Sequence, residues 1–375
     1  MARIGIVGTG YIAKGVLMAL SRTDDLEVVR VLTHSDPSRR NDYPRPALLT
    51  NSVEDLVAES DLVVVASGDP VGATAPVEAA LAASLPVVTM DAELQVTVGS
   101  HFARRGWFSE AEGDQPGCLA ALREEALAMG FSPLVYGNLK GFLNHHPTLK
   151  EMRYWSRVQG ISLDKTVAFT DGTKVQIEQA LVANGLGAGI AQDGLLGITA
   201  EDVPSGGVAL ARTAEDLGEP LSDYLLGVPG APAGVFVTAR HEEEERPYLQ
   251  YYKMGDGPYY TLLRNYHLCH LEVAKTVRRA LGGGPVLLNN GTSPAVQVVG
   301  VAKKLLKQGK VLRHPIGSFE VRGVAVRSRD HPDLVPIGLL DGARLTRHVE
   351  EGQTITQNDV DLPESRALEL WGGLR

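Results

Sequence analysis

The chain has 375 residues, 44% of them hydrophobic and 22% charged, which is ordinary globular composition and enough length for two or three domains. A net charge of −9 at pH 7, with no basic block, argues against a nucleic-acid-binding or membrane-surface protein. Two cysteines are too few for a disulfide framework or a metal cluster, and no apolar stretch is long enough to cross a bilayer. We therefore expect a soluble, cytoplasmic protein with neither a nucleic-acid nor a membrane partner.

The chain opens with a strand–turn–helix pattern. Residues 3–7 are an apolar run of strand type, residues 8–13 read Gly-Thr-Gly-Tyr-Ile-Ala, and residues 14–20 have the apolar spacing of a helix packed on a sheet. This is the dinucleotide-binding fingerprint in its required context, with the diphosphate expected at the start of the helix. The predicted cofactor contacts are Gly8, Thr9, Gly10, Tyr11 and Ile12, and Ala13 would keep helix and strand close together.

The loop after the second predicted strand, residues 26–32, bears on the choice of cofactor. It contains Thr33, Ser35 and Arg39, and hydroxyl and guanidinium groups suit the 2′-phosphate of NADP. Asp36 could instead bind the ribose 2′-hydroxyl of NAD, and Arg39 and Arg40 could be solvated loop charges. We expect NADP or NAD, with NADP favoured.

Strands and helices continue to alternate up to residue 136. The strand that begins at residue 62 ends in Ser67-Gly68, at the sheet edge where such folds bind ligands. A helix over residues 76–83, strands over 85–90 and 132–136, and a helix over 118–129 complete the pattern. The fold class is therefore α/β, with a doubly wound parallel sheet in a Rossmann domain over residues 1–136.

Beyond residue 136 the regular alternation of strands and helices ends. Residues 137–294 contain a predicted helix over 175–186, a loop-like stretch over 187–235, a strand over 235–238, a strand pair over 248–252 and 259–263, and a helix over 267–281. We interpret them as an α+β catalytic and dimerisation domain. Residues 295–375 look like a small, mostly β domain with a helix-like start over 302–306.

Two lysines are the candidate acid–base groups. Hydride transfer at a carbon that bears oxygen needs a group that exchanges a proton with that oxygen, and a partly buried lysine can serve. Lys140 lies in a Gly-bounded polar stretch with Asn144, and Lys174 follows Asp171-Gly172-Thr173. The alternatives are a solvated loop lysine for Lys140 and, for Lys174, a surface helix pair with Glu178 at i+4.

The remaining candidate residues are acids, an amide and a histidine. Glu93 and Asp114 could orient a substrate hydroxyl or bind Mg²⁺ or Mn²⁺, although no D-x-D or E-x-x-H spacing supports a metal site. His267 and His270, three residues apart on the predicted helix, could meet a metal on one face. We assign Glu93 and Asp171 to the catalytic set with the two lysines. The predicted substrate contacts are Asp114, Gln115, Asn144, Glu178 and His267.

Several blocks occur together in one order along the chain: the Gly8–Ala13 turn, Glu93 with residues 96–99, Gly113-Asp-Gln-Pro-Gly117, Asp171-Gly-Thr-Lys174 with Glu178 and Asn184, and Tyr259-Tyr260 with His267 and Glu272. In these blocks the chain resembles the homoserine-dehydrogenase-like NAD(P)-dependent oxidoreductases with a C-terminal SAF domain, the group described as 1-deoxy-D-xylulose 5-phosphate reductoisomerase-like. The chain departs from homoserine dehydrogenase at residues 90–93, where that enzyme has Asn-Lys. It departs from the SAF-bearing group at Gln95, where the group has an acid.

The resemblance implies a reductoisomerase-like oxidoreductase that acts on a small polyhydroxylated substrate, with or without a phosphate group. A plain dehydrogenase of homoserine or a sugar acid is the nearest alternative, and a nucleotide-sensing binding protein is another. The resemblance also implies a homo-oligomer, either a dimer or a tetramer.

Overall fold

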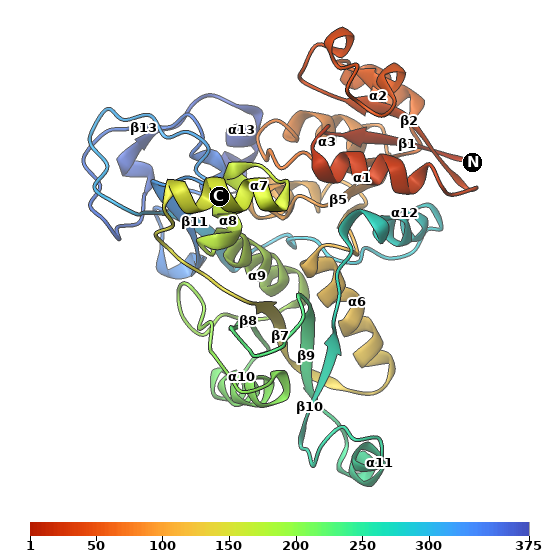
Figure 1. Ribbon diagram of the computed structural model, residues 1–375, viewed down its shortest axis with the longest axis vertical. Coiled ribbons are helices and arrows are strands. Elements are labelled where there is room, and N and C mark those ends of the chain that lie inside the picture. Colours follow the sequence, from red (N-terminus) through yellow and green to blue (C-terminus); the bar gives the residue numbers. More distant parts are fainter. Residues whose placement is uncertain (375) are drawn as a thin grey trace. The chain divides into compact units, whose positions relative to one another are not determined.

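The computed structural model describes residues 1–374 (Figure 1). The chain folds into two compact units. The first unit contains residues 1–117, residues 268–293 and the chain from Glu364 onward. The second contains residues 118–267 and 294–363. Each unit is therefore built from segments that are distant in sequence.

The first unit is organised on a six-stranded parallel sheet with the strand order β3-β2-β1-β4-β5-β6. The strands are β1 Ala2–Val7, β2 Leu26–Leu32, β3 Leu49–Thr50, β4 Leu62–Val65, β5 Val87–Thr89 and β6 Phe108–Glu110. The helices are α1 Tyr11–Leu20, α2 Val53–Glu59, α3 Thr74–Ala82, α4 Ala92–Leu94, α5 Ser100–Phe102, α12 Val273–Leu281 and α13 Arg366–Gly372. This strand order is that of a Rossmann sheet, so the predicted α/β fold class is confirmed.

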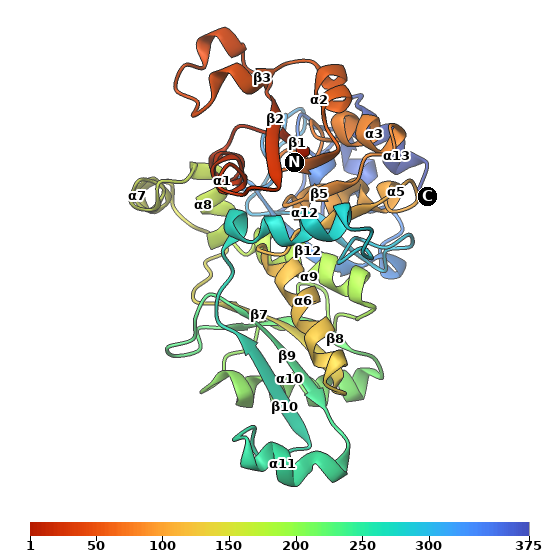
Figure 2. The same ribbon diagram turned by 90° about the vertical axis from the view of Figure 1, so that its right-hand side faces the viewer.

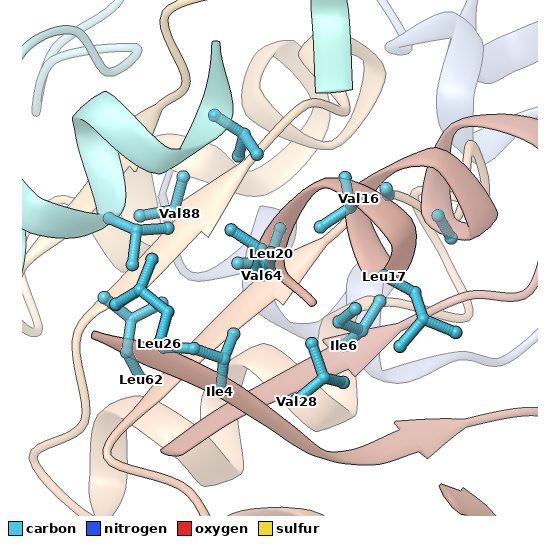
Figure 3. Packing of buried hydrophobic residues seen from close by; sticks show 14 of the residues in the cluster. Ile4, Ile6, Val16, Leu17, Leu20, Leu26, Val28, Leu62, Val64 and Val88 are labelled. Atoms are coloured by element: carbon cyan, nitrogen blue, oxygen red, sulfur yellow. The ribbon is translucent and has the colours of Figure 1, made fainter. Parts of the chain in front are cut away.

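Burial explains why the first twenty residues fold in this way. Val16, Leu17 and Leu20 recur on one face of α1 and pack on Ile4 and Ile6 of β1, together with residues of β2 and β4 (Figure 3). The four residues Leu62–Val65 are all completely buried, as expected for a central strand covered on both faces.

The second unit contains a four-stranded mixed sheet in the order β10-β9-β7-β8. Its strands are β7 Ser132–Lys140, β8 Leu221–Leu226, β9 Val235–Arg240 and β10 Tyr259–Arg264. The helices are α7 Leu149–Gln159, α8 Leu163–Thr170, α9 Thr173–Leu186, α10 Val203–Leu217 and α11 Arg246–Tyr251, while α6 Gln115–Ala128 runs into this unit from the first. β7 pairs with β8 in parallel and with β9 in antiparallel, although its first residues were predicted within the Rossmann domain.

Both faces of this sheet are covered. Tyr136 of β7 joins a buried cluster with residues of α6 and α9, whereas its neighbour Val135 joins a cluster with residues of α10. Figure 2 shows α10 against the strands of this sheet. The alternation along β7 is the period-2 pattern of a strand buried on both sides.

The C-terminal part of this unit consists of short strands and turns. β11 Val296–Ala302 pairs with β12 Val321–Arg327, and β13 Arg344–Leu345 pairs with β14 Val360–Asp361. β11 and β12 both contact α9. The helix-like start predicted over residues 302–306 is wrong, because β11 ends there and Lys303 bonds to the backbone of Glu320.

Two further predictions of secondary structure are wrong. The strand expected over residues 248–252 is largely helix α11, which starts with a proline in its first turn and leaves its tyrosines exposed. The loop-like stretch over residues 187–235 contains α10 and β8. Gly206 and Gly207 lie inside α10 because a Cβ there would collide with Leu225 and Thr238, so close packing on the sheet explains these glycines.

Candidate active site

The turn after β1 has the geometry of a phosphate-binding turn. Gly8 has φ +112°, and a Cβ at this position would lie 2.7 Å from the Ala66 carbonyl oxygen, so only glycine fits. A Cβ on Gly10 would meet no atom within 4 Å, and no side chain caps the start of α1. The first N–H groups of α1 beside this open space are suited to an anionic group.

The loop after β2 brings a different arginine to the glycine-rich turn from the one predicted. The Arg39 side chain is 85% exposed and pairs with its neighbour Asp36, 3.4 Å away. Arg40 is 21% exposed, and its Nη1 donates to Thr9 Oγ1 at 3.3 Å while its Nε donates to Asp42 at 3.0 Å. Asp36 caps the turn of residues 37–39 by accepting from the N–H and hydroxyl of Ser38.

Thr33 and Ser35 have positions that stabilise this loop. The Thr33 hydroxyl accepts a hydrogen bond from the Ser35 N–H at 3.2 Å. The amide of Asn51 donates to the carbonyl oxygens of both residues. The loop that carries Arg40 is therefore anchored by Thr33, directly after β2, and by Asn51, directly after β3.

Sequence reasoning missed Asp91, which organises the end of β4. Its Oδ2 accepts three hydrogen bonds: from the Ser67 N–H at 2.9 Å, the Ser67 hydroxyl at 2.7 Å and the Gly68 N–H at 2.9 Å. Burial raises the pKa of the Asp91 carboxyl, and Glu93 nearby acts in the same direction. The signal in the sequence was its position, directly after the strand predicted over residues 85–90.

Gln95 replaces the acid expected from the resemblance, and burial gives the reason. Its side chain is completely buried, and its Nε2 donates to Glu110 Oε2 at 3.4 Å while its Oε1 accepts from the Asn290 N–H at 3.3 Å. A carboxylate at position 95 would place two buried like charges side by side, which is unfavourable.

The Gly113–Gly117 block begins helix α6. Gly113 has φ +116°, and a Cβ there would lie 2.2 Å from the Cys269 carbonyl oxygen. A Cβ on Gly117 would lie 1.9 Å from the Ala111 carbonyl oxygen. Asp114 Oδ1 accepts from the Gln115 N–H at 3.1 Å, so both predicted substrate contacts lie at the helix start. Both glycines are required by close backbone packing.

In the second unit, Lys140 and Glu178 are brought together. Lys140 is the last residue of β7, and its Nζ lies 3.0 Å from Glu178 Oε2 on α9. The same oxygen accepts a hydrogen bond from Asn138 Nδ2 at 3.0 Å. The Glu178 side chain is 2% exposed and that of Lys140 is 17% exposed. Glu178 is therefore buried, and the alternative of a surface pair with Lys174 is wrong.

Asp171 lies at the junction between α8 and α9 and pairs with a lysine that sequence reasoning missed. Lys303 Nζ lies 2.5 Å from Asp171 Oδ2, and Asp171 Oδ1 accepts from the Thr173 N–H at 2.9 Å. Lys303 is 132 residues away in sequence, in the segment predicted as a separate domain. Burial lowers the pKa of the Lys303 ammonium, and Arg322 lowers it further. Lys174 lies in the first turn of α9, directly after Thr173.

Asn144 and the histidines have separate positions. The Asn144 side chain accepts from the His146 N–H at 3.0 Å and so shapes its own loop. Burial lowers the pKa of the His145 imidazole, which lies beside Gly172. His267 precedes α12 and bonds through Nδ1 to the Ala233 carbonyl at 3.0 Å, while His270 packs on Gly15 of α1. The predicted helix starts only at residue 273, so His267 and His270 do not share a helical face.

Within residues 1–374, no group of three or more histidine, cysteine, aspartate or glutamate side chains is arranged to hold a metal ion. In the same part of the chain, no helix has the length and apolar character needed to cross a bilayer.

Comparisons with known proteins support an oxidoreductase. Residues 113–273 match the family model described as "Oxidoreductase DRL, catalytic domain". A comparison with curated proteins gave no match. The description of the matched model mentions neither homoserine dehydrogenase nor a SAF domain, so those two features of the resemblance stay predictions.

The comparison with solved structures gave distant similarities, and three examples follow. A UDP-N-acetylglucosamine 3-dehydrogenase from Acidithiobacillus ferrooxidans is 12% identical with a TM-score of 0.44, covering 77% of this chain and 92% of that chain. A myo-inositol dehydrogenase from Corynebacterium glutamicum is 12% identical with a TM-score of 0.41, covering 75% and 88%. A Synechocystis biliverdin reductase, solved with biliverdin and NADP⁺, is 14% identical with a TM-score of 0.40, covering 77% and 93%. Similarities this distant assign no function.

The match over residues 113–273 includes Lys140, Asp171, Lys174 and Glu178. These residues therefore lie in an oxidoreductase-type catalytic domain, and the protein is an enzyme of the oxidoreductase class.

Proposed function

We propose that the protein is an NAD(P)-dependent oxidoreductase that acts on a small polyhydroxylated substrate, with or without a phosphate group. The observation that carries this proposal is the buried Lys140–Glu178 pair within the segment that matches an oxidoreductase catalytic domain. When bound, the nicotinamide would supply or accept the hydride.

The residues of the first unit fit a dinucleotide. The open space beside Gly10 and the uncapped start of α1 accommodate a diphosphate, and Gly8 permits the turn. Arg40, already bonded to Thr9, is the better candidate than Arg39 for a 2′-phosphate, because its side chain is held at the turn. On this argument we favour NADP over NAD.

Lys140 is the proposed acid–base group. Its ammonium can donate a proton to a developing alkoxide or, once neutral, accept one from a hydroxyl. Glu178 orients that ammonium, because the Glu178 carboxylate is held in turn by Asn138. Lys174 and the cation Arg322, which interacts electrostatically with Asp171, suit a substrate that carries a phosphate or a carboxylate.

The finer proposals rest on the resemblance and on the composition and pattern of the sequence. They are a rearrangement of the carbon skeleton before reduction, a SAF-like domain over residues 295–375, catalytic and Rossmann domains over 137–294 and 1–136, a dimer or tetramer, and a cytoplasmic location. Glu93 and Asp114 are kept as candidate substrate-orienting acids. A rearrangement needs two substrate oxygens held together, which lysine side chains can achieve through hydrogen bonds.

The test is an assay of purified protein with NADPH and 1-deoxy-D-xylulose 5-phosphate, and with NADP⁺ and L-homoserine or sugar acids. Binding of NADPH and NADH is measured separately by fluorescence. We expect the Lys140→Ala and Lys174→Ala variants to retain NADPH binding and to lose turnover, by about 100-fold or more for Lys140. Lys150→Ala, an exposed lysine on α7, is the matched control and should behave as the wild type.

Turnover that survives both substitutions while NADPH still binds would refute the catalytic assignment. No nucleotide binding at millimolar concentration would refute the cofactor assignment, and binding without turnover of any substrate class would favour a nucleotide sensor.

A further inference from the structure

The segment of residues 294–363 is bonded to α9 along much of the helix. The Asn184 side chain bonds to both the N–H and the carbonyl of Val296. Gln176 Oε1 accepts from the Ala325 N–H at 2.8 Å, one turn from the start of α9. These bonds link β11 and β12 to the helix that carries the candidate catalytic residues.

The bonding continues at the start of α9, where the helix is most constrained. The Thr173 hydroxyl accepts a hydrogen bond from the Gly323 N–H at 2.9 Å, and a Cβ on Gly323 would lie 2.9 Å from the Thr173 methyl group. Gly172, immediately before, has φ +86°, a left-handed conformation that ends α8 and begins α9. The direction of α9 is therefore determined within three residues.

Lys303 is the charged contact at this junction. Its side chain is 3% exposed, and its Nζ donates to Asp171 Oδ2 at 2.5 Å and to the Ser318 carbonyl at 2.6 Å. The other Asp171 oxygen accepts from the Thr173 N–H. The carboxylate thus connects the ammonium of Lys303 directly to the first turn of α9.

We propose that Lys303 is a positioning residue for the catalytic helix: by holding the Asp171 carboxylate, it fixes the start of α9 and with it Lys174 and Glu178. The role for Lys174 and Glu178 rests on the proposed function, whereas the effect on the helix start does not. Residues 294–363 are in this respect part of the catalytic domain.

The charges around Asp171 explain why a cation is needed there. The charged groups that interact with the carboxylate are Lys303 and Arg322, and His145 interacts with both of these cations. Burial raises the pKa of the Asp171 carboxyl, and Lys303 is the largest influence in the opposite direction. Without Lys303, Asp171 would take up a proton at a higher pH and would hold the Thr173 N–H less strongly.

The first experiment measures hydrogen exchange of the backbone amides of residues 171–176 by mass spectrometry, without substrate. In Lys303→Met we expect these amides to exchange about tenfold faster, because a buried carboxylate has lost its cation. The matched control is Arg347→Met, which breaks the ion pair of Arg347 with the buried Asp359 in the same segment. That control should leave the exchange of residues 171–176 unchanged.

Two further measurements separate positioning from a general loss of stability. At pH 8 the double variant Asp171→Asn/Lys303→Met, in which both side chains are neutral, should have a higher free energy of unfolding than Lys303→Met. This difference should shrink towards pH 4, because Asp171 of the single variant then becomes protonated and neutral as well. Activity is then measured against pH with NADPH and the substrate used above. Lys303→Met should lose activity as the pH falls through the raised pKa of Asp171, whereas the double variant, which lacks that carboxyl, should show no such loss.

Equal exchange of residues 171–176 in Lys303→Met, Arg347→Met and the wild type would overturn the proposal. If Lys303→Met does not fold, rescue of folding by Asp171→Asn/Lys303→Met supports the pairing, and failure of the double variant to fold any better overturns it. Absence of turnover in the wild type would overturn the proposed function only, because the exchange measurement needs no substrate.

Discussion

Replacing Gly117 with alanine should have two opposing effects on stability, a gain in helix propensity and a loss through steric overlap. Gly117 is the third residue of α6, and alanine at an unconstrained helical position stabilises a protein by about 0.5–1 kcal/mol relative to glycine. Here a Cβ would lie 1.9 Å from the Ala111 carbonyl oxygen and 2.5 Å from its carbon. The oxygen is about 1.5 Å too close, since ordinary contact begins near 3.4 Å.

The cost of overpacking should exceed the gain in helix propensity, because the obstructing atoms belong to the backbone of Ala111 and cannot rotate aside. Overpacking costs roughly 1–3 kcal/mol or more, against a propensity gain of about 1 kcal/mol. We expect Gly117→Ala to lower the free energy of unfolding by about 1–3 kcal/mol, measured by urea denaturation followed by circular dichroism.

The control is Gly372→Ala in α13, where a Cβ would meet no atom within 4 Å. It should leave the free energy of unfolding unchanged or raise it by up to about 1 kcal/mol. A Gly117→Ala variant as stable as the wild type would refute the packing argument.

Three other outcomes follow from the contacts. Lys140→Met should lower the free energy of unfolding by about 2–4 kcal/mol, because it leaves the Glu178 carboxylate buried without its cation, and Lys140→Met/Glu178→Gln should recover at least half of that loss in urea denaturation. Arg40→Ala should weaken NADPH binding about tenfold relative to NADH in fluorescence titrations, whereas Arg39→Ala should not; the reverse result would restore Arg39 as the phosphate ligand. Burial raises the pKa of Asp91 in the folded state above its value in the unfolded state. The folded state therefore holds the Asp91 proton more tightly than the unfolded state does, and the free energy of unfolding falls as the pH rises through the folded-state pKa. Asp91→Asn should therefore gain thermal stability relative to the wild type between pH 4 and pH 7, and a constant difference across that range would contradict the assignment.

Sequence reasoning predicted most of the first unit because its signals are local. The apolar run before Gly8, the glycine turn and the amphipathic α1 lie within twenty residues, and β2 begins and ends at the residues expected. The cap of α2 is equally local, since the Ser52 side chain accepts from the Asp55 N–H three residues on.

The wrong predictions of secondary structure arose where local composition was interpreted without knowledge of the tertiary contacts of the segment. Glycine-rich sequence around Gly206 suggested a loop, but the missing side chains let α10 pack closely on a sheet. The tyrosines of residues 248–252 suggested a strand, but residues 246–251 form helix α11, and Tyr248 and Tyr251 are exposed. Propensity is a weak guide when contacts distant in sequence decide the outcome.

Local patterns were enough to predict the Rossmann sheet and the glycine turn after β1, and they identified Lys140, Asp171 and Glu178 as candidate site residues. Only the folded chain decided their partners. Glu178 meets Lys140 across 38 residues and Asp171 meets Lys303 across 132, and neither separation leaves a periodic signal in the sequence. Buried charges need partners wherever the chain can supply them, so these pairings are a property of the tertiary structure.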